Sequence, residues 1–483
     1  MATFYVSTTG DDTADGLTLG SAFATLEQAR AAMATSAGAD TARVRGGTYQ
    51  LQTPLVLGTA DNGSNFAAFN GEAAVLSGGT ALTGWIKGPG GIWTAPLAQA
   101  DLHMLTLDGV QQTEARFPNQ VPDDPVKGGW LSAGNPPPGA DPRSTMRHDP
   151  ADLADAQIDP GMKVQLFTDA TWSSATQTVQ SVDKVRGIIT FVEQADFDLG
   201  THTRFFVQDG AVHLDQPGEW FFDPASQSVH FKAPPGFDGT GVVAAGDRSI
   251  VEIVGAQDVG LSGFTCSDAA TSGFNAGFAE AAVVIQGSSG VVISGNSFVN
   301  LAQGVLLTQG SSGNLVDDNL FRHLWSSAVF ADYGTNATTI TNNDIRWVTE
   351  LFAGNGAIQL SETYGDLVAH NLIRDVPRMG ILTLNFDPGL VSGNHVIEFN
   401  TVLHSMQQTT DGGAIYTWSG ADRSHMGSLY RYNHIVDAYG LEVRADGIFA
   451  PGPEYSNGIY LDDFTSDSQV YGNLIEGSVR GGI

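Results

Sequence analysis

The sequence predicts an all-β fold: a right-handed parallel β-helix with three strands per rung and a ladder of asparagines. We also expect a short N-terminal capping helix and an inserted β-rich, sandwich-like domain. Two observations carry this prediction. Glycine supplies 59 of the 483 residues, about 12% against a usual 7%, which indicates many tight turns and little helix. Two short phrases also recur in phase along the C-terminal half.

The first phrase places an asparagine just before an apolar residue, seven times over about 200 residues. A coil of roughly 22 to 24 residues with three short strands is the smallest rung of such a helix, and its rungs pair about 4.8 Å apart. Asparagine suits the bend because it tolerates left-handed backbone, and stacked copies would form a hydrogen-bonded ladder. The asparagines are Asn296, Asn319, Asn343, Asn371, Asn400, Asn433 and Asn473.

The second phrase, Gly or Ala before Val or Ile, opens a strand whose side chains should alternate between core and surface. Its first and third positions are expected to face inward. The outward positions then bring together Tyr416, Trp418, Tyr460 and Asp462. Aromatic rings beside carboxylates suit sugars, whose apolar faces stack on rings while their hydroxyls bind acids.

Residues 24–36 predict a helix, because Leu26, Ala29 and Met33 recur at i, i+3 and i+7. We expect this helix to cap the open end of the coil. Residues 1–83 are assigned to the cap and first rungs, 84–235 to the inserted domain, and 236–483 to the main coil with its cleft. The chain stops where a further strand would begin, so we expect it to be truncated at its C-terminal end.

The strongly acidic composition argues against anionic binding partners. The chain has 22 Lys+Arg against 52 Asp+Glu, a formal charge of −30, so nucleic acid and anionic membranes are not expected. A single cysteine, Cys266, excludes a disulfide framework. Residues 233–483 contain 26 acids, 9 arginines and no lysine, which disfavours a polyanionic substrate. No signal peptide is visible, and no apolar run is long enough to span a bilayer.

Four aspartates are candidate catalytic residues: Asp411, Asp422, Asp462 and Asp463. Glycoside hydrolysis needs two carboxyl groups about 5 to 9.5 Å apart. In an extended strand Asp411 and Asp462 would lie roughly 23 Å apart, so Asp411 can take part only if its segment folds over the cleft. On this geometry Asp422 is the better partner, because it lies at the same strand end as Asp462 and Asp463.

Six further residues are candidates for binding substrate: Glu362, Tyr416, Trp418, Arg423, His425 and Tyr460. The histidines show no spacing typical of a metal site. We therefore expect no metal in the active site and no required cofactor. Single aspartates could still be ligands of a structural calcium ion. The expected partner is a polysaccharide or oligosaccharide. The oligomeric state is not predicted.

Several motifs resemble known carbohydrate enzymes. The opening FYVSTTGDDTADGLTLGSAFATLEQA is similar to that of many secreted β-helix enzymes, and GGIWTAPL, LTLDGVQQTEARFPN and GEWFFDPASQSVHF resemble the inserted domain of glycoside hydrolase families 120 and 141. DGGAIYTW, SLYRYNHIVD and NGIYLDDF resemble the acidic core of family 141, although about ten more residues than expected precede the last motif.

The resemblance implies a retaining or inverting hydrolase of plant or algal cell-wall glycans, with xylosidase, xylanase and α-L-fucosidase activities among its relatives. It assigns catalysis to Asp411 and the Asp462–Asp463 pair, and an extracellular or periplasmic location. Two alternatives remain open. One is a polysaccharide lyase or uronan C5-epimerase on the same fold, for which Arg374, Arg378 and Arg423 could neutralise a uronate. The other is a non-catalytic glycan-binding module.

Overall fold

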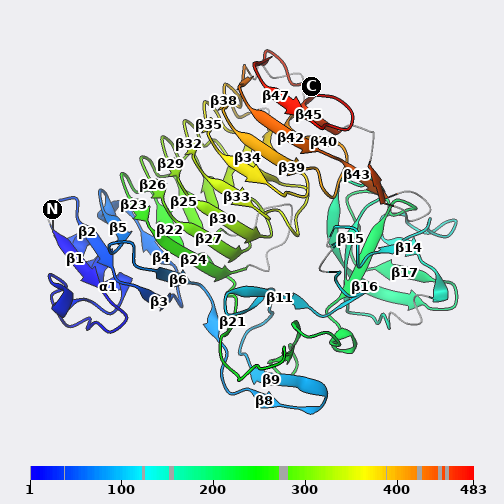
Figure 1. Ribbon diagram of the computed structural model, residues 1–483, viewed down its shortest axis with the longest axis horizontal. Helices are drawn as coiled ribbons and strands as arrows, with labels where there is room; N and C mark the ends of the chain where they lie inside the picture. Colours follow the sequence, from blue (N-terminus) through cyan, green and yellow to red (C-terminus); the bar gives the residue numbers. More distant parts are fainter. Residues whose placement is uncertain are drawn as a thin grey trace.

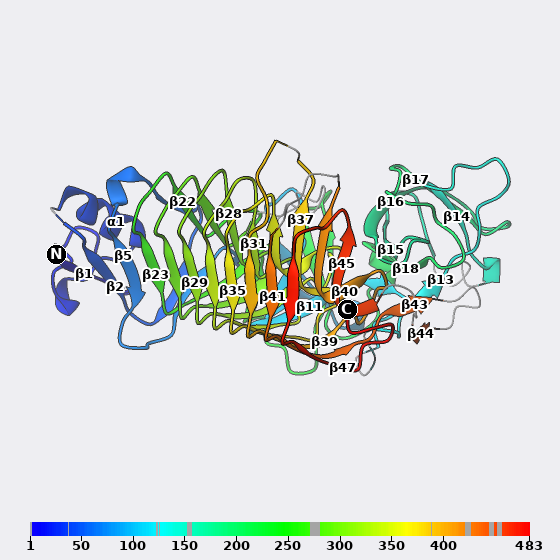
Figure 2. The same cartoon turned by 90° about the horizontal axis from the view of Figure 1, so that it is seen from above.

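The computed structural model describes residues 2–36, 38–121, 124, 126–151, 157–270, 281–387, 389–420, 427–443, 449–451 and 456–483. Most of the chain winds into a long coil of three parallel sheets, which starts at the N-terminus and ends near the C-terminus (Figure 1). An inserted β-rich region leaves the coil after its first rungs and extends beside its C-terminal end (Figure 2).

Each sheet of the coil gains one strand per rung. The 11-stranded sheet contains β1 Thr3–Val6, β2 Thr41–Val44, β5 Asn65–Ala68, β23 Gly260–Ser262, β26 Val292–Ser294, β29 Leu315–Asp317, β32 Thr339–Thr341, β35 Leu367–Ala369, β38 Val396–Glu398, β41 Leu429–Arg431 and β46 Gln469–Tyr471. The 10-stranded sheet contains β3 Gly47–Gln50, β6 Ala74–Ser77, β24 Phe264–Ala269, β27 Ser297–Leu301, β30 Leu320–Leu324, β33 Asp344–Arg346, β36 Leu372–Arg374, β39 Thr401–Ser405, β42 His434–Ala438 and β47 Leu474–Glu476. The nine-stranded sheet contains β4 Leu55–Leu57, β22 Val251–Val254, β25 Val283–Gln286, β28 Val305–Thr308, β31 Val329–Ala331, β34 Gly356–Ser361, β37 Met379–Asn385, β40 Gly412–Ser419 and β45 Ser456–Asp463.

The expected in-register stacking is confirmed inside the coil, and alternate burial is clear in strands such as β28, whereas β34 is buried at every position. In β28 the first and third residues, Val305 and Leu307, are fully buried, and Val305 pairs with Val329 of the next rung. Identical side chains stack along the axis, as Phe298 and Phe321 do with ring centroids 4.8 Å apart. One continuous apolar core therefore runs through all the rungs.

The asparagine ladder is confirmed. From Asn296 to Asn473, the side-chain Nδ2 of each asparagine donates to Oδ1 of the next, at 2.9 to 3.1 Å. The backbone N–H of each asparagine donates to the same oxygen. The ladder follows the bend between the 11-stranded and 10-stranded sheets and fixes the register of successive rungs.

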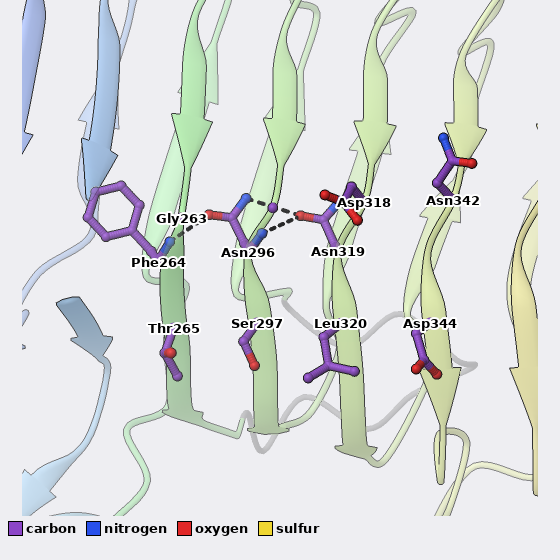
Figure 3. A pocket seen from close by; sticks show the side chains of 11 residues that line it. Gly263, Phe264, Thr265, Asn296, Ser297, Asp318, Asn319, Leu320, Asn342 and Asp344 are labelled. Carbon is purple, nitrogen blue, oxygen red and sulfur yellow. Dashed lines mark hydrogen bonds between the residues drawn. The ribbon is translucent and has the colours of Figure 1, made fainter. Parts of the chain in front are cut away.

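A groove of about 350 Å³ lies over this bend (Figure 3). It forms where the bend carries Gly263 and Gly295, and Asn296 and Asn319 form its floor. The backbone φ of these glycines is 77° and 64°, which favours residues without a side chain. The groove does not include any residue of the nine-stranded sheet, so it is separate from the acidic cluster described below.

The predicted helix is present as α1, Leu26–Thr35, capped by the Thr25 hydroxyl, which accepts from the backbone N–H of Gln28. Its buried residues are Leu26, Ala29 and Met33, the predicted apolar stripe. The helix packs against β1 and β2 at the first rung. Single 3-10 turns occupy η1 Leu19–Ser21, η2 Thr59–Asp61, η3 Pro89–Gly91 and η4 Ala211–His213.

The inserted region contains two sheets. The eight-stranded sheet is β7 Thr80–Ala81, β21 Val242–Ala244, β10 Leu105–Leu107, β11 Val110–Glu114, β19 Glu219–Asp223, β20 Ser228–Lys232, β9 Ile92–Pro96 and β8 Ile86–Lys87. The seven-stranded sheet is β12 Arg116–Phe117, β18 Arg204–Gln208, β15 Lys163–Phe167, β16 Ser174–Asp183, β17 Ile188–Phe191 and β14 Thr145–Arg147, with β13 Leu131–Ser132 paired to β18. Each sheet has its own apolar core, which refines the expectation of one sandwich-like unit. A small hairpin, β43 Leu441–Val443 with β44 Phe449–Pro451, lies near the end of the coil.

Candidate active site

Strand β40, which begins directly after Asp411, is sharply bent near its start. Strand β40 pairs with β45 at Gly412 and Gly413 and again from Ile415 to Ser419, so that only Ala414 is skipped. A Cβ on Gly413 would lie 2.9 Å from the carbonyl oxygen of Ile415 and 3.2 Å from Cβ of Tyr460. Two residues of an extended strand rise by about 6.6 Å, so the chain must turn here. Asp411 directly precedes this turn, and the charges of Asp462 and Asp463 on β45 act on its pKa.

Two carboxylates lie at the end of β45, and an aromatic side chain of β40 holds each of them. The hydroxyl of Tyr416 donates to Oδ2 of Asp462 at 2.6 Å, and the indole Nε1 of Trp418 donates to Oδ2 of Asp463 at 2.6 Å. The backbone N–H of Asp463 donates to Oδ1 of Asp462 at 2.9 Å. The two aromatic side chains therefore orient the acid pair.

Tyr416 acts as a donor to Asp462 and is not a free surface for a sugar, because only 7% of the residue is exposed. Its ring packs edge-on against Tyr460, with centroids 5.3 Å apart. Burial and the hydrogen bond to Asp462 raise the pKa of Tyr416 far above its usual value. Tyr416 thus keeps its proton and remains a donor across the whole working range of an enzyme.

Asp411 is half-buried, and its pKa lies above the usual 3.8 for an aspartate. Burial is the largest cause, the charge of Arg378 opposes it, and the charges of Asp462 and Asp463 raise the pKa further. The three carboxyl groups are thus close enough to interact electrostatically. An acid with a raised pKa beside carboxylates that accept hydrogen bonds is the arrangement expected of a general acid and its partner.

The inserted region reaches this cluster from the seven-stranded sheet. The hydroxyls of Thr171 and Thr410 lie 2.5 Å apart, and Nη2 of Arg204 donates to the carbonyl oxygen of Gln408 at 2.7 Å. Both contacts fall within three residues of Asp411. Figures 1 and 2 both show this sheet beside the C-terminal rungs. The insertion therefore borders the candidate site.

Glu362, predicted to bind substrate, has its carboxylate occupied by the protein. It accepts hydrogen bonds from the Ser361 hydroxyl at 2.6 Å, from the backbone N–H of Asp387 at 3.1 Å, and from the backbone N–H of Phe386. Only 6% of the residue is exposed. The structure thus gives Glu362 the role of holding a turn.

Asp332 is another acid on the nine-stranded sheet, and burial, with a smaller contribution from the charge of Glu362, raises the pKa of Asp332 to about 6. It follows β31, four rungs before β45. Four rungs span roughly 19 Å, so Asp332 is too far from Asp462 to form a catalytic pair with it.

Asp422, Arg423 and His425 lie outside the described residues, and their roles stay predictions. Among the residues the structure describes, no group of three or more His, Cys, Asp or Glu side chains is arranged to hold a metal ion. Within the same residues, no helix is both long enough and apolar enough to cross a membrane.

Comparisons with known proteins address the fold. A profile of the family described as "Right handed beta helix region" matches residues 279–483. A solved structure described as "Glycoside hydrolase" aligns over 100% of this chain and 97% of that chain, with a TM-score of 0.81 and 18% identity. The fold is a right-handed parallel β-helix. At this identity the likeness shows the fold alone, and the resemblance to families 120 and 141 stays a prediction.

Two more solved structures align less well. The complex of XylC with xylose gives a TM-score of 0.46 at 13% identity, over 90% of this chain and 67% of that one. A GH136 lacto-N-biosidase from Eubacterium ramulus gives 0.37 at 11% identity, over 98% of this chain and 68% of that one. No match was found among curated protein sequences.

The bend at Gly413 gives a first prediction. Gly413→Ala should lower kcat at least about 10-fold, because the new Cβ would meet the carbonyl oxygens of Ile415 and Asn457 at 2.9 and 3.1 Å and push Asp411 out of place. Gly354→Ala is the matched control, since a Cβ there meets nothing within 4 Å. Steady-state kinetics and thermal melting of both variants would check this. Equal kcat in both would contradict the role given to the bend.

Proposed function

We propose that this protein is a glycoside hydrolase acting on a plant or algal cell-wall type polysaccharide or oligosaccharide. In this proposal Asp411 is the general acid and Asp462 is the nucleophile or base. The observation that carries it is the electrostatic cluster of Asp411, Asp462 and Asp463 on one face of the coil. The 0.81 TM-score to a protein described as a glycoside hydrolase supports it through the fold.

The roles follow from the surroundings of each acid. Asp411, whose pKa is raised, gives its proton to the glycosidic oxygen while the bond from that oxygen to the anomeric carbon breaks. Asp462, oriented by Tyr416, either attacks the anomeric carbon or removes a proton from the attacking water. Water supplies the hydroxyl of the new reducing end, and Asp411 regains its proton as the cycle closes.

The charge of the site favours neutral sugars. The cluster consists of three carboxyl groups, those of Asp411, Asp462 and Asp463. Arg378 is the cation that acts on the pKa of Asp411. A uronate would be repelled by such a site unless a bound cation reversed the local field. Residues 233–483 contain 26 acids against 9 arginines and no lysine, so the net charge of the wider coil does not favour a polyanion either.

A substrate panel tests this proposal. Aryl xylosides, aryl fucosides and isolated cell-wall polysaccharides would be incubated with the protein, and new reducing ends would be measured together with ultraviolet absorbance. Reducing ends without an unsaturated product support a hydrolase. Absorbance from an unsaturated uronate would instead indicate a lyase. Binding of polysaccharide without either product would indicate a non-catalytic glycan-binding module.

A further inference from the structure

Arg378 is a buried cation at the edge of the candidate site. It immediately precedes β37, and only 6% of the residue is exposed. Its Nη2 donates to the carbonyl oxygen of Asp411 at 2.6 Å. Among the described residues it forms no ion pair, and its Nε has no hydrogen-bond partner. Burying a guanidinium without a paired carboxylate is costly, so a purely structural role is a poor explanation for it.

The guanidinium of Arg378 also contacts the inserted region. Its central carbon lies 5.1 Å from the centroid of the Trp172 ring, a cation–π contact. Trp172 is itself fixed by edge-on packing against Phe197, with centroids 4.5 Å apart. The neighbouring Thr171 contacts Thr410, the residue before Asp411. A single loop of the insertion thus touches both Arg378 and the segment that carries the acid.

We propose that Arg378 is a positioning residue for Asp411, and that Trp172 of the inserted region holds Arg378 in the productive place. The insertion is then part of the catalytic apparatus and not only a neighbouring domain. This inference rests on the proposed function, because it assigns Asp411 the role of general acid. A displacement of about 1 Å in such a group can cost on the order of 100-fold in rate.

The charge of Arg378 also affects the pKa of Asp411. The groups facing Asp411 are Arg378 before β37, Tyr416 on β40, and Tyr460, Asp462 and Asp463 on β45. Arg378 lowers the pKa of Asp411, while burial and the two acids raise it. Without Arg378 the pKa would rise further, and activity that needs the protonated acid would persist to higher pH.

Kinetics of four variants and one control variant test this. Trp172→Ala should lower kcat about 10-fold or more with little change in KM, and Trp172→Phe should recover most of the loss. Arg378→Met should shift the alkaline limb of the kcat/KM profile to higher pH, and Arg378→Lys should restore it. Trp93→Ala is the matched control, because Trp93 forms a similar cation–π contact with Lys87 in the other sheet of the insertion, at 5.6 Å.

A titration independent of activity separates the two proposals. Carboxyl carbon NMR of the full chain, with the Asp411 signal assigned through Asp411→Asn, should show a higher pKa of Asp411 in Arg378→Met than in the unmodified protein. An unchanged pKa, or unchanged kcat and pH profile in active Arg378→Met and Trp172→Ala proteins, would overturn the positioning role. Absence of hydrolysis by the unmodified protein, together with a shifted pKa, would overturn the proposed function alone.

Discussion

Replacing Asp462 by asparagine should lower kcat/KM roughly 1,000-fold or more on any glycoside the protein hydrolyses. Asparagine has nearly the same shape and can still accept the hydrogen bond from Tyr416 at its side-chain oxygen. The variant therefore removes the charge and basicity of the group while leaving the packing of β40 and β45 in place. Initial rates with aryl glycosides and a thermal melt of the same preparation would measure both effects.

Asp467→Asn is the matched control for this variant. Asp467 is an exposed aspartate a few residues beyond β45, and its left-handed backbone, with φ of 55°, is one that asparagine tolerates. We expect it to retain full activity. Normal activity in Asp462→Asn, with Asp467→Asn as reference, would remove Asp462 from the mechanism and leave Asp463 as the acid to test next.

The coil could be predicted from the sequence because its signals are local and repeated. Each asparagine occupies the same bend and bonds to its copy one rung away, so a phrase in the sequence maps directly onto a contact in space. The same holds for the outward positions of β40 and β45, where Trp418 lies opposite Asp462 as the alignment implies. In regular strands, the spacing of residues in the sequence therefore predicts which side chains lie opposite one another.

Contacts with the inserted region could not be predicted in this way. Arg378 and Trp172 are 206 positions apart in the sequence, and no repeat relates them. Nothing in either local sequence indicates that their side chains meet. The sequence indicates Arg378 only as a cation that could neutralise a uronate, whereas the structure places it against the carbonyl oxygen of Asp411.

The sequence allows Asp411 to act with Asp462 only if its segment folds over the cleft, and it does not show whether that fold occurs. An extended strand would separate them by roughly 23 Å, and the sequence offers no direct sign that the strand bends. The signal that could have revealed the bend is the Gly412-Gly413 pair, since Gly413 leaves room for Tyr460. The bend is what allows the charge of Asp462 to act on Asp411.

Replacing Asp411 by asparagine should have an effect that depends on the leaving group. On a glycoside whose leaving group is a sugar hydroxyl, kcat/KM should fall roughly 100-fold or more, because no proton is delivered to the departing oxygen. On an aryl glycoside with an acidic phenol, which departs without a proton, the loss should be less than about 10-fold. Rates for a series of aryl glycosides of increasing phenol pKa would show a steeper dependence in the variant.

The pH profile provides a second measure of the same role. A general acid works only while protonated, so the kcat/KM of the unmodified protein should fall as pH rises through the pKa of Asp411, which burial and its acidic neighbours place above 3.8. The Asp411→Asn variant should lack this alkaline limb. If the limb persisted in the variant, or if the loss were equal for all leaving groups, the proton would have to come from another residue. Asp463, held by Trp418 beside Asp462, would then be the first candidate.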